Sequence, residues 1–173
     1  MKPFTTIETL RNGKFKFLAQ IEGVTRERIA QELAGESVVS YRVPNGQSLE
    51  SVWFLQLFLG SGLVVEITAS STQVENWQEF GTININICEG AKQSKLEGVM
   101  VGIESFEIEG VNLLLHEDEK YLIESGIVLR SSQAKEIMVA AGEYPGSLTV
   151  QAPFSGGGFE PQFPDAYHMG ALL

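Results

Sequence analysis

A β-rich α+β fold is predicted for this chain: a mainly antiparallel twisted sheet with a meander-like second half, one N-terminal helix and an extended C-terminal tail. Apolar and polar residues alternate along much of the chain, only one segment has clear helical spacing, and residues 152–173 combine prolines and glycines with aromatic residues. The 173 residues, 43% of them hydrophobic, suit one domain. We expect that domain at residues 1–151, with residues 152–173 as a tail packed on the domain or on a partner.

The clearest strand pattern is at residues 82–88, where three isoleucines share one face and polar residues the other. This alternation is typical of an antiparallel sheet with one solvated face. Residues 53–59 are apolar on both parities except for Gln56, which predicts a central strand covered on both faces. The Gly-Ser-Gly turn at 60–62 then predicts a hairpin with a strand at 63–68.

The apolar alternation changes phase between residues 99–103, where odd positions are apolar, and 106–108, where even positions are. Because a one-residue slip moves every side chain to the other face of a sheet, a β-bulge or strand break is expected near Glu104 or Ser105.

Two further hairpins are expected after this point. Residues 111–115 and 121–129 flank an acidic tip, and a turn around 131–133 leads to a returning strand at 136–141. Short connections between successive strands predict an antiparallel meander.

Residues 25–34 form the one convincing helical segment. Thr25 can cap its first turn, the apolar residues fall on one face, and Gly35 can end it. A second helical turn is expected within residues 71–80, where Trp77 and Phe80 are three apart.

The tail is expected to lie extended across the domain with its aromatic side chains in surface grooves, or to dock on a second molecule. Its prolines exclude a long helix or a central strand. The glycine triplet at 156–158 fits no phosphate-binding motif and is expected to form a turn. The aromatic residues are Phe154, Phe159, Phe163 and Tyr167.

The residue inventory argues against catalysis. Twenty of the 22 acidic residues are glutamates, and the two aspartates are Asp118 and Asp165. Cys88 is the single cysteine, and His116 and His168 are the two histidines. This set can form no disulfide within the chain and no zinc motif, so we expect no metal, no cofactor and no enzymatic activity.

Two catalytic arrangements are nevertheless conceivable. Cys88 could act as a thiol nucleophile with His116 as its base, although nothing in the sequence brings the two together. Two carboxylates among Glu104, Glu107 and Glu109 could flank a glycosidic bond, but glutamates on a solvated strand face are the ordinary explanation.

Charge is distributed unevenly along the chain. The net charge is −10; residues 1–42 carry seven Lys or Arg against five Glu, whereas residues 43–173 carry five against seventeen acids. Such a surface repels nucleic acid and anionic membranes and attracts a basic protein. We therefore predict a basic protein partner. The candidate partner-binding residues are Glu107, Glu109, Glu117, Asp118 and Glu119.

The sequence shows no signal peptide pattern and no apolar run that approaches 18 residues, so a cytoplasmic location is expected.

Residues 125–129, 136–139 and 141–150 resemble a strand, hairpin and aromatic-Pro turn of small uncharacterised bacterial proteins, some of which are presumed immunity proteins of toxin systems. The resemblance covers about a quarter of the chain, carries no catalytic motif and implies no functional residue. Independently of it, Gly142 is expected to adopt a positive φ, and Tyr144-Pro145-Gly146 is expected to turn with proline second and glycine third.

Three functions remain open. The leading hypothesis is a non-enzymatic acidic protein-binding module, in particular an immunity-type inhibitor of a basic bacterial toxin domain. The second is a homo-oligomeric structural or assembly protein whose tail docks between copies. The third is a small hydrolase that uses Cys88 or a glutamate pair.

Overall fold

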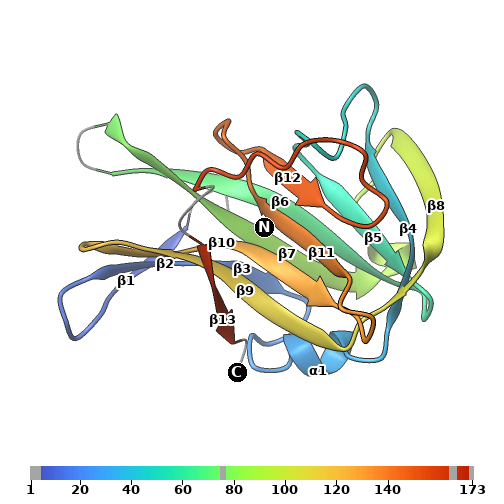
Figure 1. The fold of residues 1–173 in the computed structure, drawn as a ribbon, viewed down its shortest axis with the longest axis horizontal. Coiled ribbons are helices and arrows are strands. Elements are labelled where there is room, and N and C mark those ends of the chain that lie inside the picture. The colour runs from blue at the N-terminus through green and yellow to red at the C-terminus, as the bar shows by residue number, and fades with distance from the viewer. Residues whose placement is uncertain (1–4, 75–76, 164–166, 172–173) are drawn as a thin grey trace.

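The apolar positions that alternate along the chain meet between two β-sheets in the computed structural model, which describes residues 5–74, 77–163 and 167–171 (Figure 1). The predicted β-rich fold with one α-helix is confirmed, but two packed sheets replace the one sheet expected. No helix of the described residues is long and apolar enough to cross a membrane.

The first sheet branches at its longest strand, β10. The strand β9 pairs with one edge of β10 and in turn with β13, while the other edge of β10 pairs first with β2 and then with β11. The strands of this sheet are β1 (Thr6–Thr9), β2 (Phe15–Leu18), β9 (Gly110–Glu117), β10 (Tyr121–Arg130), β11 (Glu136–Ala141), β12 (Leu148–Gln151) and β13 (Tyr167–Ala171).

The second sheet has the order β3-β7-β6-β5-β4-β8. Its strands are β3 (Gln20–Glu22), β4 (Ser37–Pro44), β5 (Leu55–Leu59), β6 (Leu63–Gln73), β7 (Glu79–Glu89) and β8 (Gly98–Glu107). The pairings β2 with β10 and β3 with β7 are parallel, so both sheets are mixed. A 3-10 helix, η2 (Gly90–Lys92), follows β7.

The core between the sheets contains the three isoleucines of β7, as their alternation predicts. Each large aliphatic side chain buried there stabilises the fold by about 1.5–3 kcal/mol. The prediction that the opposite face of β7 is solvated is wrong for Thr82 and Asn84, which are 0% and 3% exposed. Asn84 bonds to Ser70 and Thr68 of the neighbouring strand, so these buried polar groups are satisfied within the sheet.

Glu124 occupies the place where the pairing of β10 passes from β2 to β11. Its buried carboxylate accepts a hydrogen bond of 2.8 Å from the Ala19 amide and forms ion pairs with Lys16 and Arg26. The branch point of the sheet is therefore occupied by a buried carboxylate that is paired with two basic side chains.

The helix α1 (Ile29–Leu33) is shorter than predicted. Residues 26–28 form a turn, and the N-cap position is Arg28, without a side-chain hydrogen bond. Instead of capping the helix, the Thr25 hydroxyl bonds to the Glu27 carboxyl. The backbone amide of Glu27 has the larger effect, and together with this hydroxyl it lowers the pKa of the Glu27 carboxyl. Gly35, at a positive φ of 82°, follows the helix as expected.

Several local predictions are confirmed. The strand β5 is central, with β6 and β4 on either side. The hairpin β5–β6 and the successive antiparallel pairs from β9 to β12 form as expected. Of the second helical turn expected within residues 71–80, Trp77 has 3-10 helical conformation and residues 71–73 and 79–80 are strand; residues 75–76 lie outside the described residues.

The turn at 144–147 has the predicted geometry. The Ser147 amide donates to the Tyr144 carbonyl over 2.9 Å, and Gly146 has a φ of 78°, as the third position of a type II turn requires. The expected positive φ of Gly142 is wrong. A Cβ there would instead lie 2.5 Å from the Ser147 hydroxyl, so glycine permits a close approach.

In the tail, three phenylalanines contact the same chain. Phe154 stacks on Tyr41 with ring centroids 5.2 Å apart, Phe159 packs against the outer side of the first sheet, and Phe163 stacks on His116 at 3.9 Å. After Phe163 the strand β13 pairs with β9. Asp165 and Pro164 lie outside the described residues.

Candidate functional site

The strand β8 forms one edge of the second sheet, and among the described residues its one partner strand is β4. Its pairing is regular from Gly98 to Gly102 and resumes at Phe106, with a register shift between them. This irregularity spans Glu104 and Ser105, where the sequence predicted a bulge. The shift explains why Phe106 can be buried while its neighbours are exposed.

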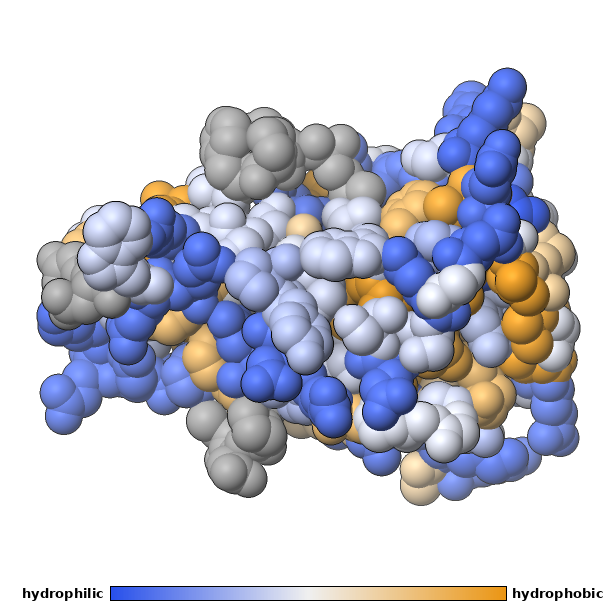
Figure 2. Space-filling model, turned by 90° about the horizontal axis from the view of Figure 1, so that it is seen from above, coloured by the Kyte–Doolittle hydropathy of each residue, from blue (hydrophilic) through white to orange (hydrophobic). Residues whose placement is uncertain are grey.

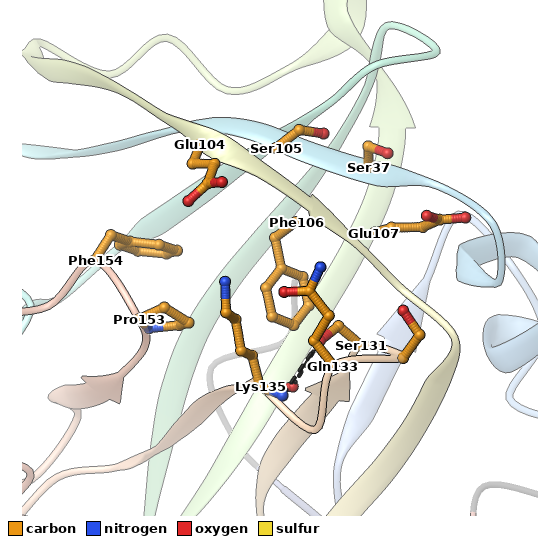
Figure 3. A pocket seen from close by; sticks show the side chains of 11 residues that line it. Ser37, Glu104, Ser105, Phe106, Glu107, Ser131, Gln133, Lys135, Pro153 and Phe154 are labelled. Atoms are coloured by element: carbon orange, nitrogen blue, oxygen red, sulfur yellow. Dashed lines mark hydrogen bonds between the residues drawn. The ribbon is translucent and has the colours of Figure 1, made fainter.

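A cavity of about 330 Å³ lies beside the second half of β8 (Figure 3). The turn at 131–135 and the start of the tail, Pro153 and Phe154, form its other walls. This volume is at the lower end of ligand pockets and suits one or two side chains rather than an oligosaccharide. The lining residues are Ser37, Glu104, Ser105, Phe106, Glu107, Ser131, Ser132, Gln133, Lys135, Pro153 and Phe154.

A second cavity, of about 350 Å³, follows the first half of β8. Phe154 lines both cavities, and its stacking on Tyr41 holds it between them. We call the two cavities together the acidic groove. The lining residues of the second part are Tyr41, Val43, Gln47, Ser48, Leu49, Glu50, Val99, Val101, Phe154, Ser155, Gly156 and Gly157.

Carboxylates predominate among the charged residues of the acidic groove. Glu50, Glu104 and Glu107 line it, and Lys135 is the one base among the described residues that do. Figure 3 shows the Glu104 carboxylate and the Lys135 ammonium turned towards the cavity, whereas the Glu107 carboxylate points away from Glu104. The groove therefore favours a cationic occupant.

The five candidate partner-binding residues do not form one patch. Glu107 lines the acidic groove, and Glu109 follows β8, where its amide donates to the Arg130 carbonyl. The other three lie at the tip of the β9–β10 hairpin. The seven residue steps along β9 separate the two groups by about 23 Å.

At the hairpin tip, two of the three acids have partners within the chain. Lys14 forms an ion pair of 2.7 Å with Glu117 and donates to the Asp118 carbonyl. The Asp118 carboxylate accepts from the amides of Lys120 and Tyr121 and so closes its own turn. Lys14 thus offsets part of the negative charge at this tip.

Cys88 and His116 do not form a catalytic pair. His116 stacks on Phe163, which contacts Phe80 near the start of β7, whereas Cys88 lies near the end of that strand. The eight steps from Phe80 to Cys88 span about 26 Å. Burial and the nearby Glu66 carboxylate raise the pKa of the Cys88 thiol, more than Lys92 lowers it, which disfavours the nucleophilic thiolate.

The glycine triplet at 156–158 lies beside the Glu50 carboxylate, whose negative charge disfavours anion binding there. A Cβ at Gly158 would lie 3.0 Å from Oε1 of Glu50. Among the described residues, no group of three or more His, Cys, Asp or Glu side chains could hold a metal ion.

A buried carboxylate outside the groove was not predicted. Glu66 of β6, 1% exposed, accepts hydrogen bonds from Gln56, Asn86 and both the amide and the hydroxyl of Ser94. Burial alone raises its pKa, but these hydrogen bonds outweigh burial and lower the pKa below the ordinary glutamate value. The network fastens the segment after η2 to the sheet.

The sequence also missed most of the acidic groove, because its walls come from separate segments of the chain, at 37–50, 99–107, 131–135 and 153–157. The change of phase in the apolar alternation at residues 99–108 was the one sequence signal at the position of the groove.

No protein-family model matches the chain, and neither the curated proteins nor the solved structures contain a significant match.

Proposed function

We propose that this chain is a non-enzymatic acidic protein-binding module whose acidic groove receives a positively charged segment of a partner protein. The observation that carries the proposal is the lining of the groove, which includes three glutamates, Glu50, Glu104 and Glu107, and a single base, Lys135. Complementary charge would accelerate association and orient the partner. An immunity-type inhibitor of a basic bacterial toxin domain is the form of this function that we favour.

The exposed apolar residues near the groove support a protein partner. Val99 and Met100 of β8 are 53% and 48% exposed, and Val39 of the adjoining β4 is 39% exposed. In Figure 2, hydrophobic surface is visible at the right-hand end, the end that β4, β5 and β8 occupy in Figure 1. A contact of this kind would combine charge with burial of apolar area.

The alternatives draw less support. Tail exchange between copies competes with the contacts that Phe154 and Phe163 make within their own chain. Hydrolysis by two carboxylates requires convergent side chains, and those of Glu104 and Glu107 point apart (Figure 3).

A fluorescein-labelled peptide of alternating lysine and valine, seven residues long and blocked at both ends, tests the proposal by fluorescence anisotropy. We expect salt-sensitive binding that Glu104→Lys weakens about tenfold, because it reverses a groove charge. Glu119→Lys, the matched variant at the hairpin tip, should leave the affinity unchanged. Equal effects of the two variants, or no binding by the unmodified protein, would refute a specific role of the groove.

A further inference from the structure

The geometry points to β-strand addition as the binding mode: the cationic segment extends the second sheet by pairing with the free edge of β8 from Gly98 to Gly102. This inference rests on the proposed function. It adds that the partner segment is extended and that its backbone forms hydrogen bonds with β8. A segment that merely places lysines in the acidic groove needs no defined backbone conformation, whereas an added strand does.

The pairing with β4 shows which backbone groups of β8 are available. The Asn45 amide donates to the Glu97 carbonyl over 3.3 Å, just before the regular pairing begins. Hydrogen-bonded and non-hydrogen-bonded pairs alternate in an antiparallel ladder, so the backbone of Val99 also faces β4. The N–H and C=O groups of Met100 and Gly102 therefore face away from β4, towards the open edge.

The edge is long and apolar enough to form a stable pairing. With ten residues, β8 is the longest of the terminal strands within the described part of either sheet. Exposed hydrophobic edges are ready templates for another strand. The register shift after Gly102 ends the regular edge, which limits the added strand to about five paired residues.

The charge on β8 selects a cationic occupant over a second copy of this chain. Each copy carries a net charge of −10, so pairing of two β8 strands would bring two acidic surfaces together, and these repel each other. An added strand with alternating basic and apolar residues would instead place one set of side chains over the acidic groove, beside Phe154, and the other set on the opposite face of the sheet.

Backbone methylation of the labelled lysine–valine peptide tests this mode. One peptide carries N-methyl groups on all valines and a second on all lysines, so that in an added strand only one set of methyl groups faces β8. We expect one methylated peptide to lose at least tenfold in affinity and the other to bind nearly as well as the parent. Equal affinities of the two methylated peptides, whether both bind or neither does, overturn strand addition but leave binding by charge intact. If the parent peptide itself does not bind, the proposed function fails instead.

The same samples test whether a second copy of the chain, rather than a cationic segment, occupies the edge of β8. Analytical ultracentrifugation of the free protein should show a monomer across the concentrations used for binding. A dimer that the peptide dissociates would assign the edge to self-association and overturn the inference.

Discussion

The amide nitrogen of Gln56 lies 2.9 Å from Oε1 of Glu66, and both side chains are buried within the second sheet. The same nitrogen donates to the Ser94 carbonyl over 3.0 Å, so a central strand, its neighbour and the segment after η2 share one polar network. Several buried donors converge on the Glu66 carboxylate and so favour a single arrangement, whereas loss of the carboxylate leaves these donors without an acceptor.

Replacing Glu66 by glutamine should destabilise the fold by about 1–3 kcal/mol, because an amide cannot accept all the hydrogen bonds that the carboxylate accepts. Urea denaturation measures this difference. Glu89→Gln is the matched control, since the Glu89 side chain is exposed and pairs only with Lys92; it should change stability by less than about 0.5 kcal/mol. Equal effects of the two substitutions would contradict the role of the network.

The same carboxyl predicts a pH dependence. Because the pKa of Glu66 is lower in the folded state than in the unfolded state, its stabilisation is complete above the ordinary glutamate pKa and is lost as the pH falls through the folded value. The difference in unfolding free energy between the unmodified protein and Glu66→Gln should therefore shrink below about pH 4.3. A difference that grows on acidification would show that the carboxyl is protonated in the fold.

Glu124→Gln should lower the free energy of unfolding by about 3 kcal/mol, because it leaves Lys16 and Arg26 without their buried counter-charge. Thermal or urea unfolding at neutral pH measures the loss. Glu32→Gln, which breaks the exposed ion pair with Arg28 on α1, serves as the control and should cost less than about 0.5 kcal/mol. A small effect at Glu124 would mean that the branch point of the first sheet does not depend on this charge.

Gly146→Ala should destabilise the fold by about 1 kcal/mol, because alanine is strained at a φ of 78°. Space is not the limit: a Cβ would lie 3.5 Å from the Trp53 ring, an ordinary contact. Gly156→Ala is the control, since a Cβ there meets nothing within 4 Å and its φ is not positive. Melting temperatures of the two variants should differ, and identical values would argue against the strained turn.

The sequence predicted what depends on local pattern. The isoleucines of β7, the hairpins from β9 to β11 and the turn at Gly146 follow from alternation and turn chemistry between near neighbours. The parallel pairings of β2 and β3 join segments more than 60 residues apart, and no local pattern signals them.

The candidate site was predicted only in part for the same reason. Counting charges along the chain placed acidity at Glu117 and Asp118, but folding brings Lys14 to that tip. The acidic groove depends on Phe154 and Lys135 approaching β8, which the sequence cannot show. Polar alternation in β7 suggested a solvated face, yet Asn84 satisfies its bonds within the sheet and is buried.

The most direct test of strand addition at β8 is amide hydrogen exchange resolved by NMR. In the free protein, the amides of Met100 and Gly102 should exchange faster than those of Val99 and Val101, which face β4. A saturating amount of the lysine–valine peptide should slow exchange at Met100 and Gly102 by at least tenfold. Unchanged exchange at these two amides, with the peptide bound, would contradict the pairing of a partner strand with β8.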